Sequence, residues 1–583
     1  KAFCTNTRDF FVAIYSINRD GAACEQGKLS LIPPVNHAIM RIRKDTRKKC
    51  DKRWEVHMAG EEMEGRGIRL LKKGQKGLIH ALFSRFGVIL LLFLLQVWFL
   101  FSILVWFEDL QPYISGVTVL FTVVMVLYLL NSRLDPTAKI TWLVIIMLMP
   151  VFGAFLLWFT KSEVGHRLIK GRVNQIAAQA RGCICQEPEA MRRLEQEDAG
   201  AAALVRYVER SGCYPVFENT AVTYFPVGEK KWEEMLRQLE QARHYIFLEY
   251  FIVDEGLMWG KVLEILARKA AEGVEVRVMY DGTCEFTTLS HNYPKRLQKL
   301  GIKCKMFAPL TPFVSTHYNY RDHRKILVID GHTAFTGGVN LADEYINHRK
   351  KHGHWKDTAV MLQGEAARSF ALMFLEMWGM EEKELEFDRF LEYPAVPQKD
   401  ASGYVMPYGD CPLDDDLVGE RVYMDILNRA RKYVHIMTPY LILDGEMETA
   451  LKFAAERGVD VKLILPGIPD KKTAYALAKT HYRSLLDSGV KIYEYSPGFV
   501  HAKLFVSDDR EGVVGTINLD YRSLYHHFEC AAYLYGVPCL ADMEADYQAT
   551  LTQCRAVTHE TLKEEPWTRR LLGCVMKVVA PLM

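Results

Sequence analysis

The sequence predicts an α/β protein with two similar halves behind an apolar amino-terminal region, and three observations lead to this fold class. First, a segment of the form His-x-Lys-x4-Asp occurs twice, at residues 323–330 and 501–508, with Gly and Asn following at the same spacing in both copies. Second, strand-like and helix-like runs alternate around each copy, which is typical of α/β layering. Third, long uncharged runs precede both copies and predict transmembrane helices.

The composition excludes several classes of protein. With 583 residues, 49% hydrophobic and 25% charged, the chain is long enough for more than one folded domain. A net charge of +2 leaves no basic excess to neutralise a polyanion, so nucleic acid is not an expected partner. The 13 cysteines follow no framework spacing, and Cys183 and Cys185 lack a second pair at zinc-site distance.

Three uncharged runs occupy the first part of the chain, and each is about as long as a bilayer crossing requires. They span residues 86–107, 113–131 and 140–159. Tryptophans near the ends of these runs match the interfacial belts of membrane helices. Residues 63–160 are therefore predicted to be a membrane region with two to three transmembrane helices. Pro150 and Gly153 could break the third run into a re-entrant piece.

The charges around these runs favour two opposite orientations. A cluster of basic residues between positions 66 and 85 precedes the first run, and the loop after that run is acidic. This pattern favours a cytoplasmic amino terminus, and three full spans would then place the soluble part outside. Basic residues that follow the third run favour a cytoplasmic soluble part instead.

Residues 1–62 are unlike the rest of the chain. They show little apolar periodicity, and the sequence Ala-Gly-Glu-Glu at residues 59–62 directly precedes Met63. Codons for Gly-Glu-Glu are purine-rich, as a bacterial ribosome-binding site is. We therefore expect the natural protein to begin at Met63, and residues 1–62 to be a translated leader or otherwise non-native.

The repeat extends well beyond the two motifs and predicts the element order of each half. Ala242-Arg-His-Tyr matches Ala430-Arg-Lys-Tyr, for example, and similar matches follow along both halves. The periodicity predicts helices at residues 232–243 and 263–271, and strands at 245–253, 274–280, 326–329 and 504–506. The expected halves are residues 217–390 and 391–583, and a helical linker at 161–216 joins them to the membrane region.

The residue types of the doubled motif suit chemistry at a phosphodiester. His and Lys are two positions apart in each copy, so on a strand both side chains point to one face. Lys325 and Lys503 can offset the phosphate charge. Asn340 and Asn518 can donate hydrogen bonds to the non-bridging oxygens. Two imidazoles can divide the remaining work, because one can attack phosphorus while the other protonates the leaving oxygen.

These features together resemble the phospholipase D superfamily, whose signature is the doubled His-Lys-Asp motif, and they are most similar to bacterial cardiolipin synthases. The resemblance covers roughly residues 63–583 and includes the hairpin at 133–153 and the segments 336–340 and 515–523. It implies two phospholipase D-like α/β halves packed as a pseudo-dimer, preceded by amino-terminal transmembrane helices. It also implies a multi-pass protein of the bacterial cell membrane.

The resemblance implies roles for individual residues as well. One histidine comes from each half, with His323 as the nucleophile and His501 as the acid and then the base. A carboxylate that follows each motif would hold the second ring nitrogen of a histidine. This requirement indicates Asp357 and Glu529 as the histidine-orienting residues.

The motif aspartates and the remaining histidines have simpler expected roles. Asp330 and Asp508 complete the catalytic motifs and are expected to brace the fold. The remaining histidines, His526 and His527 among them, are expected to be packing or surface residues. No metal and no cofactor are expected, since two lysines already neutralise the phosphate and the sequence contains no P-loop motif.

The leading functional hypothesis is cardiolipin synthesis, in which one phosphatidylglycerol passes its phosphatidyl group to another and releases glycerol. The expected partners are this phospholipid and the membrane, without nucleic acid and with no prediction of oligomeric state. Alternatives are a phospholipase D, another phosphatidyltransferase, a nuclease or an inactive membrane-tethered binding protein. The apolar tail at residues 571–583 fits either an interfacial helix or a core helix.

Overall fold

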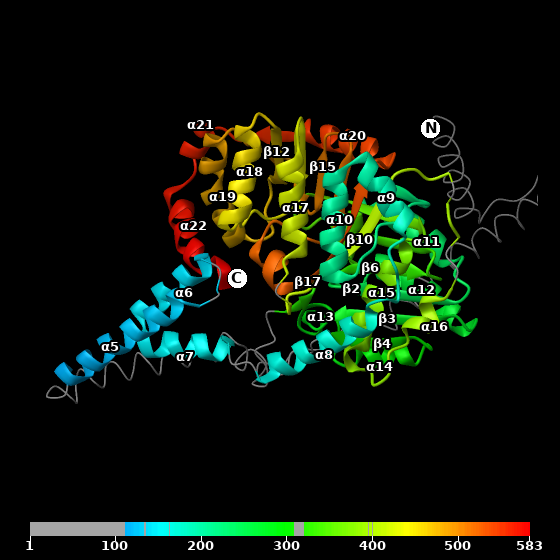
Figure 1. Cartoon of the computed structure of the whole chain (residues 1–583), viewed down its shortest axis with the longest axis horizontal. Helices are drawn as coiled ribbons and strands as arrows, with labels where there is room; N and C mark the ends of the chain where they lie inside the picture. Colours follow the sequence, from blue (N-terminus) through cyan, green and yellow to red (C-terminus); the bar gives the residue numbers. More distant parts are fainter. Residues whose placement is uncertain are drawn as a thin grey trace, which may run out of the picture. The chain divides into compact units, whose positions relative to one another are not determined.

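The computed structural model describes residues 111–132, 134, 136–161, 164–307, 320–393, 396–398, 400–414 and 416–582 (Figure 1). The expected leader at residues 1–62 and the first apolar run at 86–107 lie outside these described residues. The prediction of an α/β protein with two similar halves is confirmed, because two sheets with matching strand orders follow the apolar region.

The described apolar region consists of three helices, α5 (Gln111–Leu130), α6 (Pro136–Leu148) and α7 (Pro150–Lys161). The apolar run at residues 140–159 divides at Pro150, one of the two positions where the sequence indicated a possible break. Proline offers no N–H to the preceding turn and starts a new helix instead. Gly153 then packs on α6, where an added Cβ would lie 2.9 Å from Ile146 Cα. Among the described residues, the helices lack the combination of length and apolarity that a bilayer crossing needs.

Three helices fill the stretch between the apolar region and the first sheet. They are α8 (Val164–Ala180), α9 (Pro188–Glu197) and α10 (Ala199–Gly212). The Asp198 side chain caps α10 by accepting the N–H groups of Gly200 and Ala201. Apolar residues of all three helices, such as Ile176, Leu194 and Val205, belong to the main core. This stretch therefore packs as part of the soluble body.

The first half is built on a mixed seven-stranded sheet with the order β1-β9-β7-β6-β2-β3-β4. Its strands are β1 (Thr220–Phe225), β2 (Tyr245–Tyr250), β3 (Glu275–Asp281), β4 (Lys303–Phe307), β6 (Lys325–Ile329), β7 (Thr333–Gly337) and β9 (Ala359–Gly364). Its helices are α11 (Gly228–Leu239), α12 (Leu257–Ala271), α13 (Thr283–Thr287), α14 (Tyr293–Gln298), α15 (Ala367–Trp378) and α16 (Phe387–Leu391). Gly273 follows α12 at φ +95°, a left-handed conformation that favours glycine at a helix end.

The second half repeats this order as β10-β17-β16-β15-β11-β12-β13, with β18 added at one edge. Its strands are β10 (Tyr404–Asp410), β11 (Tyr433–Met437), β12 (Asp460–Pro466), β13 (Lys491–Tyr495), β15 (Leu504–Ser507), β16 (Glu511–Gly515), β17 (His527–Tyr535) and β18 (Cys554–Ala556). Its helices are α17 (Val418–Arg429), α18 (Gly445–Glu456), α19 (Lys472–Asp487), α20 (Cys539–Leu551), α21 (His559–Lys563) and α22 (Trp567–Val579). Helices α17, α18 and α19 stand next to one another over this sheet (Figure 1).

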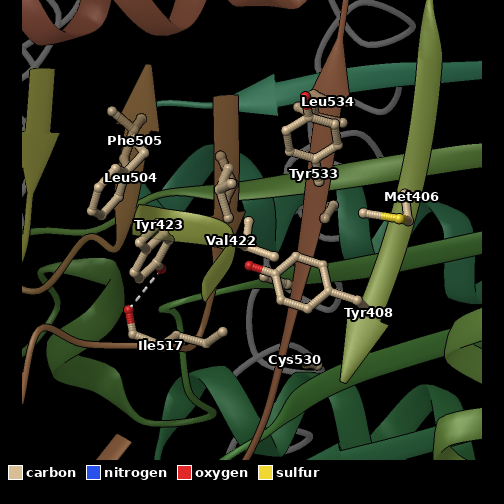
Figure 2. Close-up of a cluster of buried hydrophobic side chains, with 14 of the residues drawn as sticks. Met406, Tyr408, Val422, Tyr423, Leu504, Phe505, Ile517, Cys530, Tyr533 and Leu534 are labelled. Atoms are coloured by element: carbon tan, nitrogen blue, oxygen red, sulfur yellow. Dashed lines mark hydrogen bonds between the residues drawn. The ribbon is translucent and has the colours of Figure 1, made fainter. Parts of the chain in front are cut away.

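Aromatic side chains of α17 and of the second sheet pack together in the core of the second half (Figure 2). Tyr423 of α17 stacks on Phe505 of β15 with ring centroids 3.9 Å apart. The Tyr423 hydroxyl donates to Ile517 O at 3.0 Å, so its polar atom is satisfied inside the core. Phe505 lies two residues beyond Lys503, and this packing therefore holds the strand that begins next to the second motif.

Candidate active site

Short strands that cross between the halves position both motif histidines. Strand β5 (Arg321–Asp322) pairs in parallel with the start of β17, and β14 (Gly498–Val500) pairs in parallel with β8 (His354–Lys356). His323 directly follows β5, and its N–H donates to Phe528 O at 2.9 Å. His501 directly follows β14, and its N–H donates to Lys356 O at 2.7 Å. Each histidine is thus anchored to a strand of the opposite half.

The orienting carboxylates are exchanged between the halves in the same way. His323 Nδ1 lies 2.8 and 2.9 Å from the two carboxylate oxygens of Glu529, which belongs to the second half. His501 Nδ1 lies 2.7 Å from Asp357 Oδ2, which belongs to the first half. All four side chains are buried. An Nδ1–H held by a carboxylate leaves Nε2 as the nitrogen that can meet phosphorus or exchange a proton.

Lys325 and Lys503 each follow a motif histidine by two positions, close to the start of a strand. Lys325 begins β6, and its Nζ donates to His323 O at 2.5 Å. Lys503 Nζ donates to His501 O and lies 2.9 and 3.2 Å from the two ring nitrogens of that histidine. The prediction that the histidine and the lysine of each motif share one strand is therefore wrong. Lys325 begins β6 and Lys503 directly precedes β15, whereas each histidine lies outside its strand.

Burial governs the ionisation of these groups. It lowers the pKa of Lys325 to about 8 and that of Lys503 to about 7. It also lowers the pKa of His501 to about 4, and Lys503 acts in the same direction. The pKa of His323 falls well below its usual value through burial, although Glu529 opposes the shift. Burial therefore disfavours the charged forms of both histidines and both lysines in the free site.

The carboxylates remain ionised within this buried site. Burial alone would raise the pKa of Glu529, but His323 outweighs it and holds this pKa below the usual value. Burial opposes the shift of Asp357 too, and His501 again holds the pKa of the carboxyl low. Lys325 adds to the lowering of the pKa of both His501 and Lys503. The two motifs therefore form one electrostatic unit.

The motif asparagines are both buried. Asn340 accepts the N–H of Ile252 at its Oδ1 and donates from Nδ2 to the Tyr345 hydroxyl at 2.8 Å. The Tyr345 ring in turn lies 5.3 Å from the His501 ring. Asn518 donates to Asp520 Oδ2 at 3.2 Å. Its buried Oδ1 has no hydrogen-bond partner within the described part of the chain.

The motif aspartates lie at the opposite ends of their strands from the lysines. Asp330 accepts the N–H groups of residues 243, 244 and 245, each at 2.8 Å. Asp508 accepts those of residues 431, 432 and 433 at 2.7 to 2.9 Å. Both have positive φ angles, 52° and 53°. The structure therefore does not bring Asp330 and Asp508 to the histidines; each holds the start of a neighbouring strand.

The sequence analysis missed one residue of this site, His527. Its ring lies 5.2 Å from the His323 ring, and its Nδ1 lies 3.5 Å from Glu529 Oε1. The side chain is buried, and neither ring nitrogen has a hydrogen-bond partner among the described residues. Trp355 holds the equivalent place in the first half, two positions before Asp357 and 5.4 Å from the His501 ring. This shared spacing from the orienting carboxylates was the available signal.

One group of side chains has the composition of a metal site. His323, His527 and Glu529 each offer a ligand atom, and these atoms lie within 4.8 Å of one another. Two histidines and a carboxylate are a common ligand set for zinc. In this arrangement, however, His323 Nδ1 and Glu529 already bond to each other, so a metal would have to replace the proton between them.

Comparisons with known proteins agree with this geometry. Residues 235–378 and 423–551 match the family model described as cardiolipin synthase, PLD-like domain. An uncharacterized protein of Streptococcus mutans is 57% identical over 458 residues, which cover 79% of this chain and 99% of that protein. The cardiolipin synthase of Alkalihalophilus pseudofirmus is 32% identical and covers 77% of this chain and 89% of its own. That of Halalkalibacterium halodurans is 31% identical and covers 86% and 100%. The protein is a phosphatidyltransferase of the phospholipase D superfamily, and the chain belongs to the cardiolipin synthase family.

Proposed function

We propose that the protein makes cardiolipin by transferring a phosphatidyl group from one phosphatidylglycerol to another, with release of glycerol. The observation that carries this proposal is the reciprocal pairing of His323 with Glu529 and of His501 with Asp357. Two imidazoles, each held through Nδ1 by a carboxylate of the other half, suit a reaction in two displacements at one phosphorus.

In the first displacement, His323 Nε2 attacks the phosphorus of a phosphatidylglycerol, and the bond from phosphorus to the glycerol oxygen breaks. The phosphodiester anion in the site favours the protonated form of His501, which then supplies the proton that the departing glycerol takes up. In the second displacement, the free hydroxyl of another phosphatidylglycerol attacks the phosphohistidine and gives its proton to His501. The nitrogen–phosphorus bond breaks, and His323 is free again.

The charges around the histidines support transfer without a nucleotide or an ion. Lys325 and Lys503 can meet the charge of the phosphate, and Asn340 and Asn518 are buried close to the two motifs. The bond that forms and the bond that breaks are both phosphodiester bonds, so the exchange is nearly isoenergetic. The same roles favour Asp357 and Glu529 as orienting groups, while Asp330 and Asp508 brace the fold.

The proposed substrates lie in a bilayer, and we propose that the protein acts at the bacterial cell membrane. The exposed apolar side chains of α5 and α6 support this location, among them Leu120, Val124, Ile140 and Leu148. Nucleic acid is not a proposed partner.

Purified full-length protein given phosphatidylglycerol alone tests the proposed reaction. Lipid mass spectrometry should detect cardiolipin together with an equal amount of glycerol, and the His323→Ala variant serves as the control for contaminating activity. Phosphatidic acid as the main product would mean hydrolysis. Turnover that starts only when another alcohol is added would mean a phosphatidyltransferase with a different acceptor.

A further inference from the structure

Helix α22 has two unlike faces. Gly573 is buried against α19, where an added Cβ would lie 2.5 Å from Ala476 O, so this side is a tight helix contact. Large apolar side chains are exposed elsewhere on the helix at a spacing of four, four and three residues, which forms one stripe. This apolar stripe consists of Trp567, Leu571, Val575 and Val578, with exposed fractions of 73%, 55%, 56% and 38%. The tail is therefore both a packed helix and an open apolar surface.

A strongly basic pocket adjoins this helix. It has a volume of about 600 Å³ and lies between α19, α21 and the start of α22. Its basic lining residues are Lys479, Arg483, His559, Lys563, Arg569 and Arg570. Glu565 is the acidic residue of the lining, so cationic groups predominate. Such an excess of one charge in a concave surface attracts an anion.

Some basic side chains of the pocket form ion pairs or hydrogen bonds within the protein, and others do not. Several are bound internally: Lys479 pairs with Glu494 at 2.6 Å, Arg569 pairs with Glu565, and Arg570 donates to two backbone carbonyls. Arg483 and Lys563 are exposed, and within the described residues no ion pair or hydrogen bond engages either side chain. These two cations are therefore available to an external anion.

The pocket also has apolar walls, which distinguish its ligand from a free ion. Ala476, Leu562 and Cys574 line it together with the basic side chains. Its mouth lies on the same helix that carries the apolar stripe. A cationic pocket next to an exposed apolar helix face fits a molecule with an anionic head and an apolar body.

We propose that the basic pocket binds the anionic headgroup of a membrane phospholipid while the apolar stripe of α22 lies in the membrane interface. This site is separate from the catalytic histidines and does not depend on the reaction proposed above. The chain directly after α22 contacts the residue before His527, because Pro581 O accepts from His526 Nε2 at 3.3 Å. The same helix accepts the Thr141 hydroxyl of α6 at Val578 O, at 2.6 Å. A lipid bound here would thus hold the rim of the active site at the bilayer surface.

Binding of phosphatidic acid to full-length protein in neutral detergent, followed by native mass spectrometry, tests the pocket. Phosphatidic acid is anionic and lacks the alcohol that would leave in a transfer reaction. The Arg483→Gln/Lys563→Gln variant should bind it about 30-fold more weakly, since each cation near the lipid headgroup contributes roughly a fivefold effect. Arg210→Gln/Lys299→Gln removes the same charges from exposed positions on other helices and should bind as the unmodified protein does.

Four results would overturn the proposal. The pocket variant could bind phosphatidic acid with unchanged affinity, or the charge control could lose as much affinity as the pocket variant. Inorganic phosphate could displace the lipid at equal concentration, which would indicate a site for a free ion. Loss of all lipid binding in His323→Ala would assign the lipid to the catalytic site instead.

The stripe has a separate test in full-length protein reconstituted into phosphatidylcholine vesicles with and without phosphatidic acid. Amide hydrogen exchange in α22 should slow when the anionic lipid is present, and Leu571→Gln/Val575→Gln should remove that protection. Equal exchange in both kinds of vesicle would contradict the joint action of pocket and stripe.

Discussion

Glu529 holds Nδ1 of His323 across the boundary between the two halves, although the two residues are 206 positions apart. The reciprocal pair, Asp357 and His501, crosses the boundary in the other direction over 144 positions. Each half therefore contains a histidine without its carboxylate and a carboxylate without its histidine. The complete site exists only when both sheets are assembled, which makes the repeat a single catalytic unit.

The two lysines should matter to catalysis more than to folding. Lys325→Ala or Lys503→Ala should lower kcat/KM by roughly 10²-fold or more, because each removes a positive charge from the site where phosphate charge must be stabilised, commonly worth about 3 kcal/mol. Initial rates with phosphatidylglycerol measure the effect, and circular dichroism checks the fold. Lys299→Ala, which changes an exposed lysine directly after α14, is the matched control. Near-normal rates in either active-site variant would contradict a shared phosphate site.

The pH profile of kcat/KM should fall on its alkaline side. Lys503 and Lys325 have pKa values of about 7 and about 8, lowered chiefly by burial. As pH rises through this range both ammonium groups lose their protons, and the free site loses the positive charge that attracts the phosphodiester. His501 has a pKa of about 4, so no acid limb from this group is expected near neutral pH. The profile is measured at one constant detergent concentration. If kcat/KM stays flat through this pH range, Lys325 and Lys503 do not supply the positive charge that attracts the phosphodiester.

Chelation should leave the transfer reaction intact. Two lysines face the phosphate, and His323 Nδ1 is already bonded to Glu529, so the reaction does not need a metal at that position. Initial rates before and after dialysis against excess chelator measure this. The His323, His527 and Glu529 group makes the outcome informative, because these are the described side chains with metal-site geometry. Activity that disappears and returns only with one particular divalent ion would replace the metal-free mechanism.

The repeat made most of the fold predictable. Offsets between the halves stay nearly constant, and the strands of both sheets are apolar runs bounded by glycine or polar residues. Helix α11 shows the limit of this signal, since it begins at Gly228 and the periodicity placed its start at residue 232. The apolar residues of α11 follow the helical spacing only after its first turn. Their periodicity therefore located the helix but not its first residue.

The cross-half contacts of the site could not be predicted from periodicity. Strands β5, β8 and β14 contain two or three residues each, which is too short for an alternating pattern to emerge. They nevertheless decide which carboxylate meets which histidine. His527 was missed for a related reason, because within its own half only its spacing of two positions before Glu529, matched by Trp355 before Asp357, distinguishes it from a packing residue.

Gly338 should be intolerant of any side chain for a catalytic reason. An added Cβ there would lie 2.0 Å from Asp357 Oδ1, the carboxyl group that holds His501. Because the end of a side chain can move, Gly338→Ala should still fold, but the displaced carboxylate should release His501. We expect turnover to fall by roughly 10²-fold, as for loss of an oriented acid–base group. Gly260→Ala is the control, since nothing lies within 4 Å of its added Cβ. Equal rates in the two variants would show that Asp357 is not needed in its place.

The roles of the two histidines give the sharpest test. If His323 is the nucleophile, His501→Ala should still form some phosphatidyl-enzyme but release it slowly, because the missing group must protonate the glycerol and later activate the acceptor. His323→Ala should form none. Trapping with labelled phosphatidylglycerol, followed by peptide mapping of the phosphohistidine, measures both variants.

Variants of the two orienting carboxylates can be compared in the same experiment. Asp357→Asn should slow release as His501→Ala does, to a smaller extent, and Glu529→Gln should slow formation of the phosphatidyl-enzyme, since each replaces the carboxylate that holds one Nδ1–H by a neutral amide.

The surroundings of the two histidines differ enough for the assignment to have a physical basis. Glu529 accepts hydrogen bonds from Thr516 as well as His323 and has His527 beside it, whereas Asp357 sits against Gly338 and accepts from Thr358 N. His323, whose Nδ1 meets both carboxylate oxygens of Glu529, suits the group that must stay aligned with phosphorus through both displacements. Label found on His501 would reverse the two roles and keep the two-step reaction. Absence of label from every variant, together with rates that depend on both lipids at once, would replace the phosphohistidine with direct transfer.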